Sequence, residues 1–216
     1  MKNFLKRRFR RFAADDTGTI TVESILILPV VMWAFVATFV YYDAFASRTA
    51  SQRAAYTISD SIGRQQNDVL TPEDLESYNR IFGYLSKTQR DTRLRVSSVV
   101  WNPGDELYEI VWSYATNEGI PMTEADLTPE LVARLPVLPQ RESAYIVETS
   151  VNFVPLTEAL PLSGIILRRQ TLREFIVSRP RFSPQLRFDD GTGLVGTTFP
   201  TCDDPGVICG TEDPGA

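Results

Sequence analysis

The chain has 216 residues, of which 43% are hydrophobic and 23% are charged, and its formal net charge at pH 7 is −5. It contains no histidine, which removes the commonest general base and the usual catalytic triads. It also has no glycine-rich phosphate loop and no G-x-S-x-G motif, so we expect a protein that is not an enzyme and needs no cofactor.

The first 18 residues form a basic leader that contains six lysines and arginines and two aspartates. Its net charge of +4 leaves −9 for residues 19–216, which is not typical of a nucleic-acid-binding body. Short basic segments beside an apolar span stay in the cytoplasm. The charge therefore predicts a cytoplasmic N-terminus and a C-terminal body on the other side of the membrane.

Residues 24–42 are nineteen consecutive uncharged positions, rich in Ile, Leu, Val, Phe and Trp. At about 1.5 Å per residue, a helix of this length matches a hydrocarbon core of roughly 30 Å. A cleaved secretory signal has a shorter apolar region of roughly 7 to 15 residues, and uncharged runs this long are rare in the core helices of soluble folds. We therefore predict one membrane-spanning helix, which Pro29 bends.

The helical pattern continues beyond the apolar run, with apolar residues at intervals of three and four up to Gly63. This spacing predicts a single long helix over residues 19–66, whose outer half lays one apolar stripe on the soluble domain. A second helix is predicted from Thr71, because Thr71 can cap it and Pro72 suits its first turn.

Four extended segments follow, and the first two flank an Asn-Pro-Gly-Asp turn sequence that predicts a hairpin. Trp101 and Trp112 flank this turn and are interpreted as a cross-strand aromatic cluster. Residues 123–134 are predicted as a short helix or as two turns broken by Pro129. The four predicted strands are residues 93–101, 107–114, 143–154 and 170–179.

The last part of the chain is rich in Gly, Pro, Asp and Thr, which predicts an irregular tail. Cys202 and Cys209 lie on the side predicted to be outside, where disulfides persist, so a short disulfide loop is expected, with two free thiols as the alternative. A zinc site needs more ligands than lie nearby, and Asp189 and Asp190 lack the spacing of a calcium loop. We expect no metal site.

These segments together predict an α+β fold. A long N-terminal transmembrane helix continues into an extracytoplasmic domain with a roughly four-stranded antiparallel sheet and short helices. The predicted parts are a basic cytoplasmic leader at 1–18, the long helix at 19–66, the α+β domain at 67–182 and the tail at 183–216.

A basic run lies near the end of the predicted domain, on a body that is otherwise acidic. We interpret it as a polar sheet edge that discourages strand pairing, with an acidic partner domain as the alternative. The run consists of Arg168, Arg169, Arg173, Arg179 and Arg181.

The N-terminal residues resemble a known family. They resemble the pattern of type IV pilin-like precursors, which have a basic leader, a glycine, a glutamate at the fifth position after it and a long apolar helix. Here the glycine is Gly18 and the glutamate is Glu23. The stretch GTITVESILILPVVMW resembles the TadE-like family of tight adherence (Tad) pilus systems, whose members typically read G-x-x-x-V-E before an apolar run with a proline. The sequence FIVSRPRF at 175–182 is similar to the close of many TadE-like ectodomains.

The resemblance implies that a membrane aspartyl prepilin peptidase cuts between Gly18 and Thr19. It also implies that Glu23 pairs with the freed amine of Thr19 on a neighbouring subunit, whereas simple solvation at the membrane interface is the alternative for this carboxylate. Such a protein lies in the bacterial inner membrane with a periplasmic C-terminal domain.

The function that the resemblance implies is that of a minor pilin or pseudopilin. It would act in assembly of a Tad-type pilus together with other pilin-like subunits and the assembly machinery. The alternative is a bitopic inner-membrane anchor whose extracytoplasmic domain binds a partner unrelated to pili.

Overall fold

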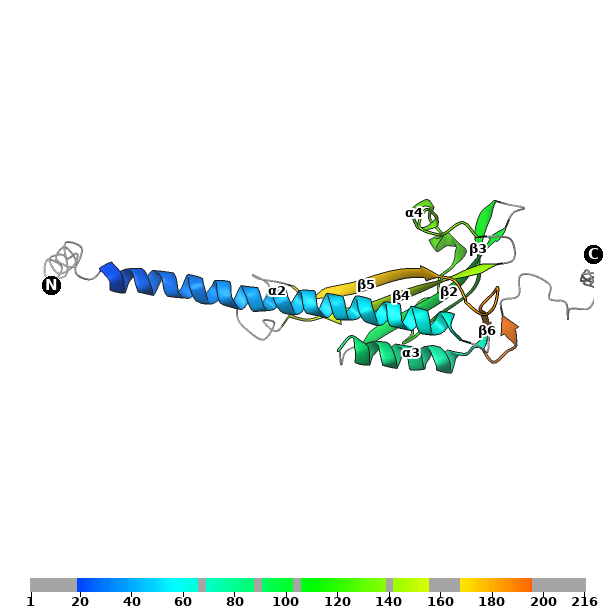
Figure 1. Cartoon of the computed structure of the whole chain (residues 1–216), viewed down its shortest axis with the longest axis horizontal. Coiled ribbons are helices and arrows are strands. Elements are labelled where there is room, and N and C mark those ends of the chain that lie inside the picture. Colours follow the sequence, from blue (N-terminus) through cyan, green and yellow to red (C-terminus); the bar gives the residue numbers. More distant parts are fainter. Residues whose placement is uncertain are drawn as a thin grey trace, which may run out of the picture. The chain divides into compact units, whose positions relative to one another are not determined.

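The computed structural model shows an α+β fold with a long apolar N-terminal helix and a four-stranded antiparallel sheet, as predicted (Figure 1). The chain divides into two compact units, residues 1–45 with 155–168 and residues 46–154 with 169–216. The structure describes residues 19–65, 69–87, 91–102, 106–138, 142–155 and 168–195.

Helix α2 covers Thr19–Gly63, close to the predicted bounds of 19–66. Within the second unit, its buried residues recur at intervals of three and four and so form one stripe. This observation confirms that the outer half of the helix is amphipathic, and two alanines in the stripe allow its backbone to lie close to the sheet. The stripe consists of Ser51, Ala54, Ala55, Ile58, Ser59 and Ile62.

Helix α3 covers Pro72–Leu85 and begins where the sequence predicts. The Thr71 hydroxyl accepts a hydrogen bond from the Asp74 amide at 3.2 Å, and the Asp74 carboxylate accepts one from the Thr71 amide at 3.0 Å. This reciprocal capping box satisfies two amide groups at the start of the helix. Leu75 and Phe82 are fully buried on its inner face.

Replacing Thr71 by alanine should lower the free energy of unfolding by about 1 kcal/mol, because the cap of α3 loses its acceptor. Urea unfolding of the full chain in detergent micelles measures this change. Ser77→Ala is a matched control, since the Ser77 hydroxyl bonds only within the same helix, where it donates to Glu73 O and accepts from Arg80. An equal loss of stability in both variants would show that the cap contributes nothing of its own.

The four predicted strands are all present and pair antiparallel in the order β3-β2-β4-β5. In the register, Val96 of β2 lies opposite Val147 of β4, which in turn lies opposite Ile176 of β5. Strands β3 and β5 are therefore the edges of this sheet. The strands are β2 (Thr92–Asn102), β3 (Leu107–Ala115), β4 (Ser143–Phe153) and β5 (Gln170–Ser178).

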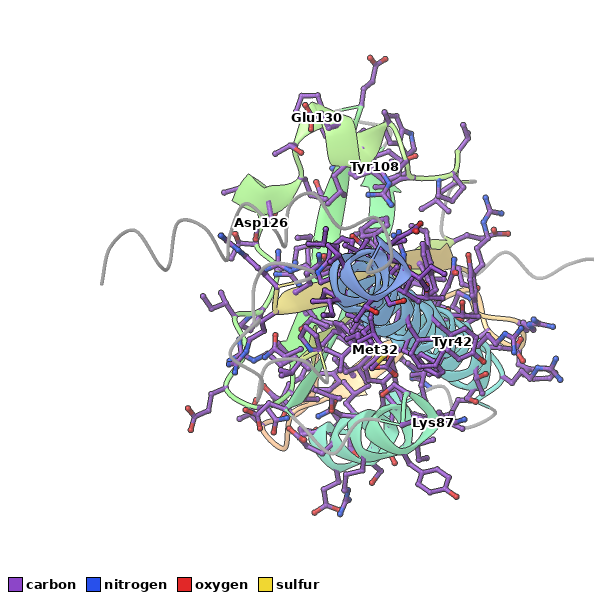
Figure 2. All side chains as sticks on the ribbon, turned by 90° about the vertical axis from the view of Figure 1, so that its left-hand side faces the viewer. Met32, Tyr42, Lys87, Tyr108, Asp126 and Glu130 are labelled. Carbon is purple, nitrogen blue, oxygen red and sulfur yellow. The ribbon has the colours of Figure 1, made fainter. Side chains whose placement is uncertain are left out.

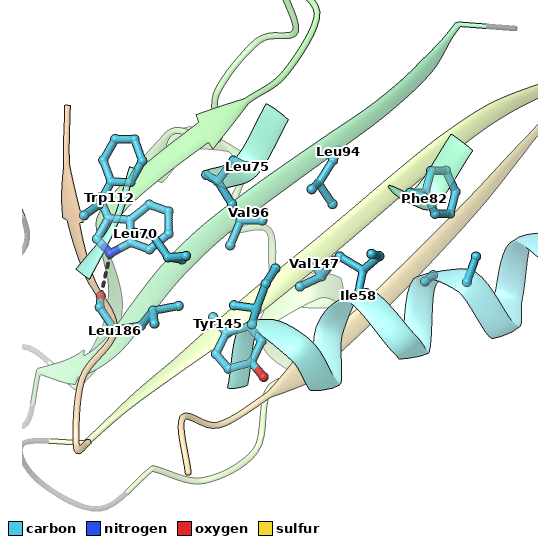
Figure 3. Close-up of a cluster of buried hydrophobic side chains, with 14 of the residues drawn as sticks. Ile58, Leu70, Leu75, Phe82, Leu94, Val96, Trp112, Tyr145, Val147 and Leu186 are labelled. Carbon is cyan, nitrogen blue, oxygen red and sulfur yellow. Dashed lines mark hydrogen bonds between the residues drawn. The ribbon is translucent and has the colours of Figure 1, made fainter. Parts of the chain in front are cut away.

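The main core lies on the face of the sheet that α3 and the second half of α2 cover, which we call the helix face (Figure 3). Tyr145 is completely buried there, and its hydroxyl donates to Ser59 O of α2 at 2.9 Å. Burial raises the pKa of the Tyr145 phenol above its ordinary value of 10.0. A side chain at Gly63 would collide with the same hydroxyl, so glycine allows α2 to approach the sheet at this point.

The opposite face, which we call the loop face, carries a second apolar cluster under residues 122–138. This segment contains a 3-10 turn, η2 (Glu124–Asp126), and a short helix, α4 (Pro129–Val132). The prediction of two turns is therefore correct, and the alternative of one short helix is wrong. Pro129 separates the two turns and is the first residue of the second. The buried residues of the cluster are Val99, Met122, Leu135, Leu138, Ala144 and Ile146.

The predicted contact between Trp101 and Trp112 is wrong. Trp101 meets Tyr108 at a ring-centroid distance of 4.9 Å and packs with the loop-face cluster. Trp112 stacks on Phe188 at 4.8 Å and belongs to the helix-face core. The register between β2 and β3 shifts between Ser98 and Val99, and such an irregularity changes which side chains of a strand point to each face.

The expectation of an irregular tail from residue 183 is also wrong for its first part. Strand β6 (Arg187–Asp189) pairs in parallel with β1 (Val69–Leu70) and antiparallel with β7 (Leu194–Val195), which forms a small second sheet. The Trp112 indole donates to Leu186 O at 2.7 Å and so attaches this segment to the core. Strands of two or three residues are too short to show a hydrophobic period in the sequence.

Candidate functional site

The candidate site is the apolar part of helix α2, residues 24–42. Four successive side chains, Ile25, Leu26, Ile27 and Leu28, are 68%, 66%, 48% and 64% exposed. Because each helical step turns by about 100°, four exposed neighbours cover the whole circumference of the helix. Figure 2 views the chain along this helix and labels Met32 and Tyr42 on it, and both side chains are exposed.

This exposure distinguishes the two halves of the helix. In the outer half one stripe is buried on the sheet, whereas only 6% of the most apolar window of α2 is buried in the structure. A helix that is apolar on all sides needs an apolar environment on all sides, such as a membrane or other apolar helices. Among the described residues, α2 is the one helix long and apolar enough to cross a membrane by length and composition.

The serine and threonine hydroxyl groups in this segment bond to the backbone of their own helix. Ser24 Oγ donates to Ile20 O at 2.8 Å, and Thr38 Oγ1 donates to Ala34 O at 2.9 Å. Both bonds span one helical turn, so neither hydroxyl needs water or a partner on another element. This is the arrangement that allows Ser and Thr to lie in an apolar solvent at low cost.

Glu23 is the charged residue at the inner end of the apolar run. It is the fifth residue of α2 and is exposed, and within the described residues it has no ion pair or hydrogen bond. The arrangement therefore offers one carboxylate, next to an exposed apolar surface, for pairing with a cation outside the chain.

The other predicted site residues are only partly described. Thr19 is the first residue of α2. Gly18, at the predicted cleavage point, and Cys202 and Cys209, at the predicted disulfide, lie outside the described residues.

The described part of the chain contains no group of three His, Cys, Asp or Glu side chains that could hold a metal ion. Asp189 Oδ1 accepts from the Gly191 amide at 2.9 Å, and Asp190 Oδ1 accepts from the Thr192 amide at 2.8 Å. The hydrogen bonds from the Thr192 hydroxyl and amide lower the pKa of Asp190 below its ordinary value of 3.8. Both aspartates therefore act in ordinary turns.

The structure separates the basic run into residues with different roles. Arg179 pairs with Glu142 at 3.3 Å, and Arg181 pairs with Asp60 of α2, so these two arginines connect the end of β5 to neighbouring segments. The Arg181 amide also donates to Gly63 O at 3.0 Å. Arg173 lies instead on the loop face of the edge strand β5, which is consistent with the predicted polar edge.

Sequence reasoning missed a groove on the loop face, where Arg173 lies near Arg93, Arg95 and Arg134. The sequence does show that Arg93 and Arg95, two positions apart in a strand, lie on the same face of the sheet. It does not show which residues of other strands lie beside them. Only the strand register brings these side chains together.

Comparison with protein-family models, curated proteins and solved structures gave no match to this chain.

Proposed function

We propose that the chain is a membrane-anchored pilin-like protein, a minor pilin or pseudopilin of the TadE-like type, that acts in assembly of a Tad-type pilus. The observation that carries the proposal is the contrast within α2. Its residues 20–35 are exposed on all sides and mostly apolar, and its second half is buried on one side against an antiparallel sheet. This layout is the one expected of a subunit whose helix serves both as anchor and as assembly surface.

The N-terminal sequence supports the pilin-like assignment over a plain anchor. Gly18 and Glu23 stand at the positions that the resemblance to pilin-like precursors requires, immediately before the apolar run. In this proposal a prepilin peptidase cleaves between Gly18 and Thr19, and the new amine of Thr19 becomes the cation for Glu23 of a neighbouring subunit. Cleavage removes the basic leader and at the same time creates the charge that assembly uses.

The proposed location is the bacterial inner membrane. The basic leader holds the N-terminus in the cytoplasm, and the domain of residues 46–154 and 169–195 lies in the periplasm. Tyr41, Tyr42 and Asp43 then lie at the periplasmic interface, where tyrosine rings are favoured.

Cleavage can be tested by intact mass and N-terminal sequencing of the membrane-extracted chain, expressed with and without the cognate peptidase. We expect a chain that begins at Thr19 only when the peptidase is present. Gly18→Leu should abolish this cleavage, whereas Ala14→Leu in the same leader should not.

A chain that still begins at Met1 beside an active peptidase would contradict the pilin-like assignment. If that chain nevertheless resists extraction from membranes by alkaline carbonate, it is the alternative protein, a bitopic anchor with an extracytoplasmic binding domain. A chain that carbonate releases would contradict both functions.

A further inference from the structure

The loop face of the sheet carries a groove of about 720 Å³ near the start of β2 and the end of β4. Two rows of side chains cross its floor in the strand register. Arg93, Ser150 and Arg173 form the first row, on three adjacent strands. The second row consists of Arg95, Glu148 and Phe175.

The other two arginines of the groove, Arg95 and Arg134, already have partners. Arg95 forms an ion pair with Glu148, and both side chains are about three-quarters buried, at 29% and 25% exposure. The guanidinium of Arg134, which follows α4, lies over the Phe175 ring at 4.1 Å from the ring centroid. These contacts fix the positions of the walls of the groove and leave little of this charge for a ligand.

The arginines of the first row are different. Arg93 and Arg173 are exposed, and within the described residues neither has an ion pair or a hydrogen bond. One strand separates them, so their Cα atoms lie about 10 Å apart, and long side chains on the same face can reach one anion over Ser150. Two unpaired guanidinium groups are placed to bind carboxylates with charge-assisted hydrogen bonds.

The groove also has an apolar wall. Ile120 lines it and is 81% exposed, and Leu131 lines it beside Phe175. A ligand that fits therefore carries carboxylates at one end and aliphatic side chains at the other. The volume suits a short peptide segment, because pockets of roughly 300–1,000 Å³ hold ligands much larger than a single anion.

We propose that this groove binds the acidic segment of residues 201–213 of a second copy of this chain. The segment, TCDDPGVICGTED, combines Asp203 and Asp204 with the aliphatic pair Val207 and Ile208, and residues 196–216 include no lysine or arginine. On a chain whose residues 19–216 carry a net charge of −9, the groove is a local concentration of positive charge. The carboxylates of the segment thus match the arginines of the groove, and its aliphatic pair matches the apolar wall.

Chain length favours a second copy over the same molecule. Val195 pairs with Phe188, which stacks on Trp112 on the helix face, whereas the groove lies on the loop face. Eight Cα steps separate Val195 from Asp203, which spans about 28 Å when fully extended. The path must round the edge of the sheet and also advance about 17 Å along β2, from the level of Ser98 to that of Arg93. The advance along β2 alone uses more than half of this extended length, before the chain rounds the edge.

The test uses the full chain in detergent micelles and a fluorescent peptide with the sequence of residues 201–213, in its reduced and its disulfide forms. Fluorescence anisotropy should show binding of at least one form that weakens as salt is added. R93Q/R173Q should weaken it by about tenfold or more, because both charge-assisted contacts are lost. R48Q/R53Q removes the same charge from α2 and should leave the affinity within about twofold.

Three results would overturn the proposal. The first is no binding of either peptide form at up to about 1 mM, the weakest affinity worth assigning to a specific contact. The second is equal binding of a D203N/D204N peptide, which would show that the arginines do not recognise its carboxylates. The third concerns a chain that carries D203N/D204N in its own tail. If this variant binds the peptide several-fold more tightly than the unchanged chain at every protein concentration, the unchanged tail competes with the peptide within one molecule, and the groove's occupant is the tail of the same molecule. This test does not depend on leader cleavage or on pilus assembly.

Discussion

Replacing Tyr145 by alanine is expected to lower the free energy of unfolding by about 3–5 kcal/mol, the range for deleting a large buried aromatic ring. Tyr145 is completely buried where β4 meets α2, and its hydroxyl donates to Ser59 O. The substitution removes ring packing against both elements and leaves a cavity between helix and sheet (Figure 3). Urea unfolding of the full chain in micelles, followed by tryptophan fluorescence, measures the loss.

Two variants control for the chemistry of this change. Tyr56→Ala removes the same atoms from the same helix-and-sheet region, but its ring is 57% exposed, so the loss should stay within about 0.5 kcal/mol. Tyr145→Phe keeps the ring and should cost about 1 kcal/mol for the lost hydrogen bond. If Tyr145→Ala cost no more than Tyr56→Ala, α2 would not be attached to the sheet as described.

The Tyr145 phenol should also make the free energy of unfolding depend on pH in the alkaline range. Burial raises the pKa of Tyr145 in the folded chain above the value of 10.0 that it has when unfolded. Its stabilising contribution is therefore complete below pH 10 and is lost as the pH rises through the folded-state pKa. Tyr145→Phe should remove that part of the alkaline loss of stability.

Replacing Glu23 by glutamine should reduce incorporation of the chain into pilus assemblies by about tenfold or more while leaving membrane insertion and leader cleavage unchanged. In the proposed assembly Glu23 pairs with the amine of Thr19 on a neighbour in an apolar environment. Removing one partner of such a pair leaves the other charge without compensation, which costs about 3–5 kcal/mol in buried sites. The amount of chain that co-purifies with the other pilin-like subunits measures the effect.

Asp43→Asn is the matched control for this variant. Asp43 is the charged residue at the other end of the apolar run, so the same loss of one carboxylate there should leave co-purification unchanged. Normal assembly of the Glu23→Gln variant would contradict the pairing role and would favour interfacial solvation of Glu23. Equal loss in both variants would show that negative charge beside the membrane matters in general, and not the position of Glu23.

The elements with strong local signals were predictable. The hairpin of β2 and β3 follows from two β-rich segments around a turn sequence, and α3 follows from a threonine cap, a first-turn proline and an apolar face. Such signals depend on residues close together in the chain. The bounds of the four strands consequently agree with the structure within two residues at each end.

The failures involve contacts between residues far apart in the chain. Trp101 and Trp112 lie on opposite faces because of the register shift between β2 and β3, which the pattern of apolar residues does not show. Strand β6 exists because it pairs with β1, more than one hundred residues earlier in the chain, and because Trp112 holds Leu186. Neither interaction has a local sequence signal.

Some features of the candidate site could likewise be predicted from the sequence, and others depend on contacts between distant residues. The sequence by itself determined the apolar segment of residues 24–42 and the position of Glu23 in front of it, because length and charge are properties of the chain alone. The apolar spacing also predicted that the outer half of α2 lies against the domain, but only the tertiary structure decided that its stripe packs on the helix face of the sheet, through contacts such as that of Tyr145 with Ser59. Only the pairing of β4 with β2 and β5 placed Arg93 and Arg173 on either side of Ser150, since side-chain neighbours across a sheet depend on register.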